Sequence, residues 1–266
     1  MRFVFVEILK NPIILVFIMN KISFYTCNDI EIVTGTGMHE FPYHSHNSYM
    51  AGAVLDGCGE FCIDKHFSIL NKNDVYVVPS NTAMSMKPMH DFSYITICFK
   101  NDLANMLNKC EAKKYYYRNL GYILLNMSDN FQAKLIDENT FTNTLIKLLN
   151  LKVSNTPLQP KNSMITKAMQ YINDNCAEKF DLERLAEEVF LSKYYLVRLF
   201  RREMGITPHQ YYQQCKVREL RKMAPCFSQK NIAYELNFST QSHMDSVFKK
   251  YMGITMKNYI SSIEHK

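Results

Sequence analysis

Residues 182–211 read LERLAEEVFLSKYYLVRLFRREMGITPHQY, and residues 231–259 read NIAYELNFSTQSHMDSVFKKYMGITMKNY. The second stretch repeats the first in register, since the triplet Gly-Ile-Thr at 205–207 returns 48 residues later at 253–255. Other matching pairs, 47 or 48 residues apart, are Leu185 with Ile232, Phe200 with Phe248 and Tyr211 with Tyr259. A spacing kept over so many positions indicates two copies of one structural unit.

Each unit reads as two short helices joined by a tight turn. In the first unit, apolar side chains recur at helical spacing over residues 182–189, and Asp181 stands where it would cap this helix. Ser192 is placed to cap a second helix, which buries one apolar face and stops at Gly205. Two helices in this arrangement describe a helix-turn-helix, and the second unit follows the same plan.

The second helix of each unit leaves a polar face open. Such a helix fits the major groove of DNA, where arginine can bond guanine, and glutamine adenine, through two hydrogen bonds. Asp245 would repel phosphate, so the second unit is expected to read DNA less strictly than the first. The predicted DNA-binding residues are Lys193, Tyr194, Val197, Arg198, Arg201 and Arg202 in the first unit, and Thr240, Gln241, Ser242, Asp245, Lys249 and Lys250 in the second.

Positive charge is concentrated in the half of the chain that holds the repeat. The 266 residues carry 31 Lys and Arg against 25 Asp and Glu, a net charge of +6, and 47% are hydrophobic. Residues 1–160 hold 14 basic and 14 acidic side chains, so the whole excess lies in residues 161–266. The composition excludes a disordered chain, and the basic half favours a polyanionic partner over a helical bundle with merely solvated charges.

The first half reads as short strands followed by helices. Between residues 22 and 100, apolar runs alternate about every 8 to 12 residues with turns rich in Gly, Asn and Asp. This pattern is typical of a β-sandwich or a β-barrel. Residues 101–151 change to helical periodicity, and the stretch VSNTPLQPKN at 153–162 has two prolines and no periodicity, as expected of a linker.

The cysteines and the N-terminus bear on the compartment. The eight cysteines form no C-x-x-C pair, so reduced buried thiols are expected. Residues 1–20 are apolar, but Glu7, Lys10 and Pro12 interrupt them and leave only residues 13–19 as an unbroken run. About 20 apolar residues are needed to span a bilayer. We therefore expect a cytoplasmic protein with no membrane partner, and residues 1–20 as a packed extension or as sequence upstream of an alternative start codon.

Together these features resemble the AraC/XylS family of bacterial transcription regulators. The resemblance covers residues 165–260 and rests on the two quoted stretches. It implies a long helix from about 207 to 223 that joins the two units and sets their recognition helices in successive major grooves, about 34 Å apart. It also implies the function of the protein, which is regulation, in the sense of activation, at promoter DNA with contact to RNA polymerase.

Five positions depart from the family's pattern, and two of them are Met256, which replaces the family's second Pro, and Ile260, which replaces its following Arg. The first turn usually has Gly where this chain has Phe190, which must avoid a positive φ or shift the turn. The second turn has Asn237 in place of Gly, a mild change because Asn tolerates the left-handed region. Ser246 replaces a commonly basic residue of the second recognition helix. These departures weaken the expected recognition of DNA sequence by the second unit and leave the expected fold unchanged.

The first half resembles the cupin-like sensor domain of the same family, through residues 41–49 and 74–79. The predicted fold class is therefore α+β, with an N-terminal cupin-like β-barrel and flanking helices before an all-α domain of two helix-turn-helix units. The expected parts are a sensor and dimerisation domain at 1–153, a linker at 154–162 and a DNA-binding domain at 163–266. The helices of the sensor domain would form a homodimer, as they commonly do in relatives.

His44 and His46 are the candidate sensor residues, because two positions apart on a strand their side chains share one face. With His39 or His90 they could hold a metal, but the Glu and the later His of a cupin metal centre are missing, so no metal or cofactor is predicted. A small-molecule effector pocket walled by His44, His46 and Tyr49 is one alternative, and histidines that only satisfy core hydrogen bonds are another. The rival function is a metal-dependent cupin enzyme with a helical appendage, for which no catalytic residue is predicted.

Overall fold

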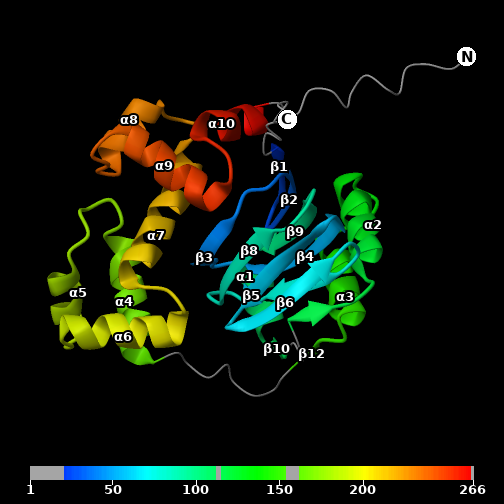
Figure 1. Cartoon of the computed structure of the whole chain (residues 1–266), viewed down its shortest axis with the longest axis horizontal. Coiled ribbons are helices and arrows are strands. Elements are labelled where there is room, and N and C mark those ends of the chain that lie inside the picture. Colours follow the sequence, from blue (N-terminus) through cyan, green and yellow to red (C-terminus); the bar gives the residue numbers. More distant parts are fainter. Residues whose placement is uncertain (1–20, 112–114, 154–161, 265–266) are drawn as a thin grey trace, which may run out of the picture.

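The computed structural model describes residues 21–111, 115–153 and 162–264. The expectations for residues 1–20, and for the linker apart from residue 162, lie outside the described residues. Strands come first along the chain and the long run of helices comes last (Figure 1). We call the part from β1 to β12 the sheet domain and the part from α4 to α10 the helical domain.

Two antiparallel sheets form the sheet domain. Six strands lie in the order β1-β2-β9-β4-β7-β11, and four lie in the order β3-β8-β5-β6. A short ladder of β10 and β12 stands apart from both. The strands are β1 (Lys21–Cys27), β2 (Ile30–Thr36), β3 (Phe41–Ser45), β4 (Tyr49–Asp56), β5 (Cys58–Ile63), β6 (His66–Asn71), β7 (Val75–Val78), β8 (Ala83–Pro88), β9 (Ser93–Phe99), β10 (Cys110–Glu111), β11 (Tyr116–Tyr117) and β12 (Lys152–Val153).

The six-stranded sheet is covered on both faces. One face packs against three helices through buried side chains such as Leu124 and Phe141, and the other packs against the four-stranded sheet through Phe61 (Figure 1). Strand β4 is accordingly buried from Tyr49 to Val54, without the alternation of a half-exposed strand. The helices are α1 (Asn101–Asn108), α2 (Gly121–Gln132) and α3 (Glu138–Leu148), all within the predicted helical segment.

The predicted α+β fold class is confirmed, but the strands do not close into a barrel. No strand in the described part of the chain pairs one sheet with the other, so β1 and β11 end the first sheet and β3 and β6 end the second. The domain is a two-sheet sandwich, with helices on the outer face of the larger sheet. Strand spacing in a sequence gives the number of strands but not their closure, which depends on pairing between strands far apart in the chain.

The helical domain contains the two predicted helix-turn-helix units. Helix α7 lies between them and begins at Pro208 behind its cap Thr207, in agreement with the expected joining helix (Figure 1). The helices are α4 (Ser163–Asp174), α5 (Leu182–Glu188), α6 (Lys193–Met204), α7 (Pro208–Met223), α8 (Gln229–Glu235), α9 (Gln241–Met252) and α10 (Met256–Glu264).

All eight cysteines are free thiols, as expected, but only five of them are buried, since Cys27 and Cys58 are half-buried and Cys226 is exposed. Within the described residues, no helix has both the length and the apolar content that crossing a bilayer requires.

Candidate functional site

The caps and buried faces of the first unit follow the sequence pattern. The Asp181 carboxylate accepts from the backbone N–H groups of Glu183 and Arg184, at 2.9 and 3.1 Å, and so begins α5. Ser192 caps α6 by accepting from the backbone N–H of Tyr195 at 3.3 Å. Helix α6 then buries one apolar face and ends at Gly205, whose φ of 72° lies in the left-handed region.

The turn of the first unit contradicts the expectation for Phe190. Its φ is 57°, in the region that bulky residues rarely adopt, and its side chain is 89% exposed. The turn keeps its shape because the N–H of Phe190 donates to Glu187 O, and the N–H of Leu191 to Ala186 O. Phe190 therefore takes the glycine-like conformation, and neither avoids it nor shifts the turn.

The second unit has the same construction. Asn237 takes a φ of 52° in its turn, as expected, and Thr240 caps α9 by accepting from the backbone N–H of His243 at 3.0 Å. Helix α9 buries Met244 and Phe248 and ends at Gly253, with a φ of 75°. Both second helices thus bury an apolar face and turn the opposite face outward.

Most predicted DNA-binding residues lie on those outward faces. Tyr194 is 81% exposed, and neither α6 nor α9 is covered as a whole by neighbouring elements. Exposed residues of the set are Tyr194, Arg198, Arg201 and Arg202 on α6, and Thr240, Gln241, Ser242, Lys249 and Lys250 at the start of α9 or on it. Lys193, Val197 and Asp245 are half-buried.

Some of these residues already have partners within the protein. Lys193 donates to Glu183 at 2.6 Å, so this ion pair must open before Lys193 can contact DNA. Gln241 donates to Gln229 at 2.8 Å. Asp245 is the least suitable reader, because burial raises the pKa of its carboxyl and one of its oxygens is enclosed without a hydrogen bond.

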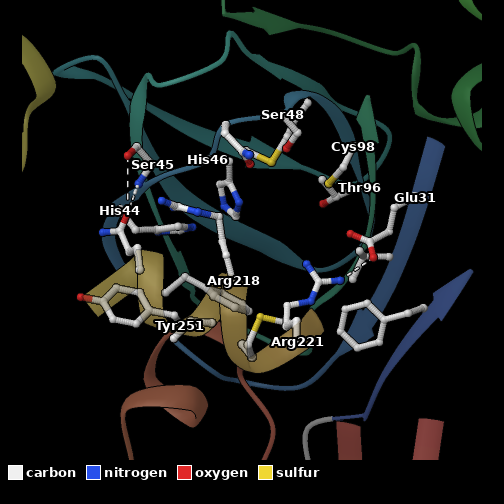
Figure 2. A pocket seen from close by; sticks show the side chains of 18 of the residues that line it. Glu31, His44, Ser45, His46, Ser48, Thr96, Cys98, Arg218, Arg221 and Tyr251 are labelled. Atoms are coloured by element: carbon white, nitrogen blue, oxygen red, sulfur yellow. Dashed lines mark hydrogen bonds and ion pairs between the residues drawn. The ribbon is translucent and has the colours of Figure 1, made fainter. Parts of the chain in front are cut away.

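A cavity of about 600 Å³ lies between the two domains (Figure 2). The sheet domain contributes apolar side chains, among them Phe24, Met50 and Met84, and α7 contributes Arg218 and Arg221. Apolar residues and polar or charged residues share the wall about equally, and the cationic groups come mainly from the helical side. The cavity therefore offers a partly apolar chamber with a positively charged wall, in the size range of small-molecule sites.

His44 and His46 both line this cavity, with ring centroids 4.7 Å apart. The Nδ1–H of His44 donates to Pro42 O at 2.6 Å, because a carbonyl oxygen can only accept. Burial holds the pKa of His46 well below its ordinary value, and the nearby His44, Arg218 and Arg221 add to this. Tyr49 does not line the cavity, in contrast to the prediction, because its side chain points to the other face of the sheet and is buried in the core under the helices.

A buried ion pair connects the two domains at the cavity wall. Arg221 on α7 donates to the carboxylate of Glu31 on β2, and Lys100 lies 3.7 Å from the same oxygen (Figure 2). Burial alone would raise the pKa of Glu31, but Arg221 and Lys100, with a hydrogen bond from Thr26, more than offset it, so the pKa is lowered. Burial disfavours the charge of Arg221, yet Glu31 and Tyr259 keep its pKa raised.

Further contacts join the domains around the cavity. Gln214 on α7 accepts from the backbone N–H of Ser45 at 3.1 Å. His39 donates from Nε2 to the backbone oxygen of Lys250 at 3.2 Å. The rings of Phe24 and Tyr259 meet edge to face, with centroids 5.1 Å apart. The sheet domain thus contacts both the joining helix α7 and the second helix-turn-helix unit.

Sequence reasoning missed Glu31, Arg218 and Arg221 as site residues. One signal was available, since Arg218 and Arg221 stand three residues apart on a predicted helix and so share a face that the DNA prediction did not use. No comparable signal marked Glu31, which is one acidic residue in a predicted strand.

Besides the histidines, the cavity wall includes two other side chains of metal-ligating types, the carboxylate of Glu31 and the thiol of Cys98. Among the residues that the structure describes, no three His, Cys, Asp or Glu side chains gather closely enough to hold a metal ion. Burial, with the charge of Glu31, raises the pKa of the Cys98 thiol to about 12, so this cavity thiol stays protonated near neutral pH.

Comparison with known proteins places the chain among regulators. Residues 185–262 match the family model described as a helix-turn-helix domain. The chain is 21% identical to the Msm operon regulatory protein of Streptococcus mutans, over 82% of this chain and 86% of that protein. It is also 21% identical to RafR, the raffinose operon transcriptional regulatory protein of Pediococcus pentosaceus, over 84% and 89%.

Solved structures with the same two-domain fold include ToxT from Vibrio cholerae. One superposes with a TM-score of 0.59 at 12% identity, covering 92% of this chain and 98% of ToxT. Another, of ToxT bound to an unsaturated fatty acid, gives a TM-score of 0.57 at 14% identity, covering 91% and 96%. At such identities the likeness shows the fold, with a sheet-rich domain before a helical one.

Proposed function

We propose that the chain is a DNA-binding transcription regulator of the AraC/XylS family and that it sets α6 and α9 in successive major grooves of promoter DNA. The observation that carries the proposal is the pair of outward polar faces, each ending in two cations. Arg201 and Arg202 end one face, and Lys249 and Lys250 end the other. These cations hold phosphates, while Arg198 and Gln241 read bases.

A salt titration tests this proposal. The probe is a duplex selected from a random-sequence pool with the full-length protein, and its affinity is measured by fluorescence anisotropy at several salt concentrations. Four phosphate contacts give a slope of log affinity against log salt of about −3.6, since each contributes about −0.9. Failure to select any duplex, or a flat salt response, contradicts the proposal and favours a scaffold that binds protein.

The effector that fits the cavity is an amphipathic anion. The apolar chamber suits a hydrocarbon tail, and Arg218 and Arg221 suit a carboxylate, which accepts hydrogen bonds from both guanidinium groups. The fatty acid bound to ToxT, which shares the fold, supports this class of ligand. In this proposal His44 and His46 form part of the wall and hold no metal.

Activation through RNA polymerase and homodimerisation complete the proposed function. Dimerisation through α2 and its following turn is supported by the exposed apolar side chains of Tyr122, Ile123 and Leu135. We assign residues 1–153 to sensing and dimerisation, 154–162 to the linker and 163–266 to DNA binding. A protein that regulates a bacterial promoter works in the cytoplasm, where the chromosome lies.

The rival enzyme reading has weaker support. The curated relatives are named as regulators, and the cavity lacks the ligand set of a cupin metal centre among its described residues. Metal analysis of the purified full-length protein separates the two, because an enzyme of that class would hold about one metal ion per chain.

A further inference from the structure

Charge in the cavity wall is unbalanced. The described residues of the wall include four cations, Lys100, Arg218, Arg221 and Lys222, and a single acidic residue, Glu31. Lys222 is neutralised outside the cavity by Glu219 at 2.7 Å, and Arg218 donates to the uncharged amide oxygen of Asn173 at 3.1 Å. The carboxylate of Glu31 is thus the one anion that the cavity itself provides for its cations.

Glu31 is held at the place where an anionic ligand would bind best. Its side chain is only 6% exposed. One carboxylate oxygen, Oε1, accepts hydrogen bonds from Arg221 and Thr26 and also lies 3.7 Å from Lys100 Nζ. Removal of one partner from a buried ion pair leaves an uncompensated charge and is strongly unfavourable. Exchange of one carboxylate for another avoids this cost, because Arg221 stays paired throughout.

Lys100 provides the displaced carboxylate with a partner. Its side chain is 36% exposed and follows β9 within the sheet domain, on the same side of the interface as Glu31. After exchange, Glu31 can stay with Lys100 while Arg221 pairs with the ligand. The exchange therefore breaks the ion pair of Glu31 and Arg221, which joins the two domains. The ion pair of Glu31 and Lys100, within the sheet domain, remains.

The pairing that breaks is a link to the helix that orients both DNA-binding units. Arg221 lies in the last turn of α7, and its guanidinium carbon is 5.5 Å from the ring centroid of Phe24 and 5.5 Å from that of Tyr259. Helix α7 connects the first unit to the second, so its attachment to β2 affects the placement of both.

We infer that Glu31 is a built-in competitor of the effector: the anionic group of an amphipathic ligand replaces the Glu31 carboxylate on Arg221, and this exchange unlinks β2 from α7. The inference rests on the proposed function, which supplies the ligand class and the DNA readout. It adds the residue that the ligand displaces and the contact through which binding reaches the DNA-binding units.

The test uses the full chain with palmitoleate as the acid and palmitoleyl alcohol as its uncharged match. Binding is measured by calorimetry, and DNA affinity by anisotropy with the selected duplex. Glu31→Gln removes the competing charge at nearly constant size, and Glu60→Gln, at an exposed site on β5, is the matched control. We expect Glu31→Gln to bind palmitoleate about tenfold more tightly than wild type and Glu60→Gln to bind it equally, a ratio typical of coupled sites.

The DNA readout tests the link itself. Palmitoleate should change the DNA affinity of the wild type, the alcohol should not, and unliganded Glu31→Gln should show the change that palmitoleate causes. Equal palmitoleate affinity in Glu31→Gln and wild type, or an alcohol as effective as the acid, overturns the inference. If Glu31→Gln does not fold, Glu31→Asp takes its place, because the shorter side chain keeps the charge but weakens the pairing with Arg221 and should also bind palmitoleate more tightly than wild type.

Failure of the proposed function gives a different result. A wild-type protein that binds the selected duplex but not palmitoleate contradicts the effector proposal and this inference with it. A wild-type protein that binds both, with no effect of residue 31, contradicts this inference only.

Discussion

Phe190 and Asn237 occupy the same place in the two units and adopt nearly the same backbone, with φ values of 57° and 52°. For Asn this conformation is tolerated, whereas for Phe it is strained, at a cost of about 1–2 kcal/mol. The aromatic ring recovers little of this cost by packing, because it is almost fully exposed. The first turn therefore requires a backbone conformation that its central residue, Phe190, disfavours.

Phe190→Gly should raise the free energy of unfolding by about 1 kcal/mol, since glycine adopts this φ without strain. Urea unfolding of the full chain measures the change. Asn237→Gly is the matched control and should show a smaller gain. A Phe190→Gly protein less stable than wild type would mean that the ring makes contacts which its exposure conceals.

Arg198 is the sharpest test of base reading, because its exposed guanidinium lies on the outward face of α6, 5.4 Å from the ring of Tyr195. Arg198→Ala should weaken binding to the selected duplex by about 1–3 kcal/mol and relax the preference at one base pair. Arg198→Lys keeps the charge but not the paired hydrogen bonds, so it should restore affinity without the preference. Unchanged preference in Arg198→Ala refutes the assignment.

At the scale of the element, α7 decides how the two units are spaced. Its start is fixed by a reciprocal cap, in which Thr207 accepts from the N–H of Gln210 and Gln210 accepts from the N–H of Thr207, at 3.2 and 2.9 Å. Gly205 ends α6 just before this cap, so only three residues, 205–207, separate α6 from α7. The helix then carries Gln214 and Arg221 toward the sheet domain.

Thr207→Ala removes the cap of α7 and should lower the free energy of unfolding by about 1 kcal/mol. Thr207→Ser keeps the accepting hydroxyl and should lie close to wild type. Chemical denaturation followed by circular dichroism compares the three proteins, and a Thr207→Ala protein as stable as Thr207→Ser would show that the cap contributes nothing.

At the scale of the whole molecule, the cavity exists only because the two domains meet. Its histidines belong to β3 and the residue that follows it, while its arginines belong to α7. His46 is therefore buried beside cations that the fold supplies from a distant part of the chain, and the low pKa of its ring follows first from burial and then from these charges. Stability should depend on pH for the same reason.

Between pH 7.5 and 5.5 the protein should lose stability as the pH falls. The unfolded chain binds a proton at His46 near its ordinary pKa of 6.5, whereas the folded protein does not, so protons favour unfolding in this range. The effect of this residue grows as the pH falls below 6.5 and reaches at most about 1 kcal/mol at pH 5.5. The lowered pKa of Glu31 places its own loss of stability at lower pH, below its ordinary value of 4.5.

His46→Gln should flatten this dependence by that amount, and His90→Gln, at an exposed site, should leave it unchanged. Urea unfolding at three pH values measures both. Equal slopes in wild type and His46→Gln would show that the folded protein accepts the proton at this position.

The sequence predicted those features that depend on neighbours along the chain. The caps at Asp181 and Ser192, the terminal glycines and the outward faces of both second helices follow from residue types within one or two turns. The repeat strengthened each of these predictions, since the same signals occur twice. The fold class and the helix-turn-helix units were therefore determined by the sequence itself.

Only the tertiary structure decided the rest. The sequence predicted Tyr49 as a wall residue of the pocket, yet its face of β4 lies under the helices and belongs to the core. Closure of the sheets depends on pairings that no local pattern records. The ion pair of Glu31 and Arg221 joins residues 190 positions apart, and its burial makes the loss of either partner costly, so neither its existence nor its effect on the cavity can be read from residue types alone.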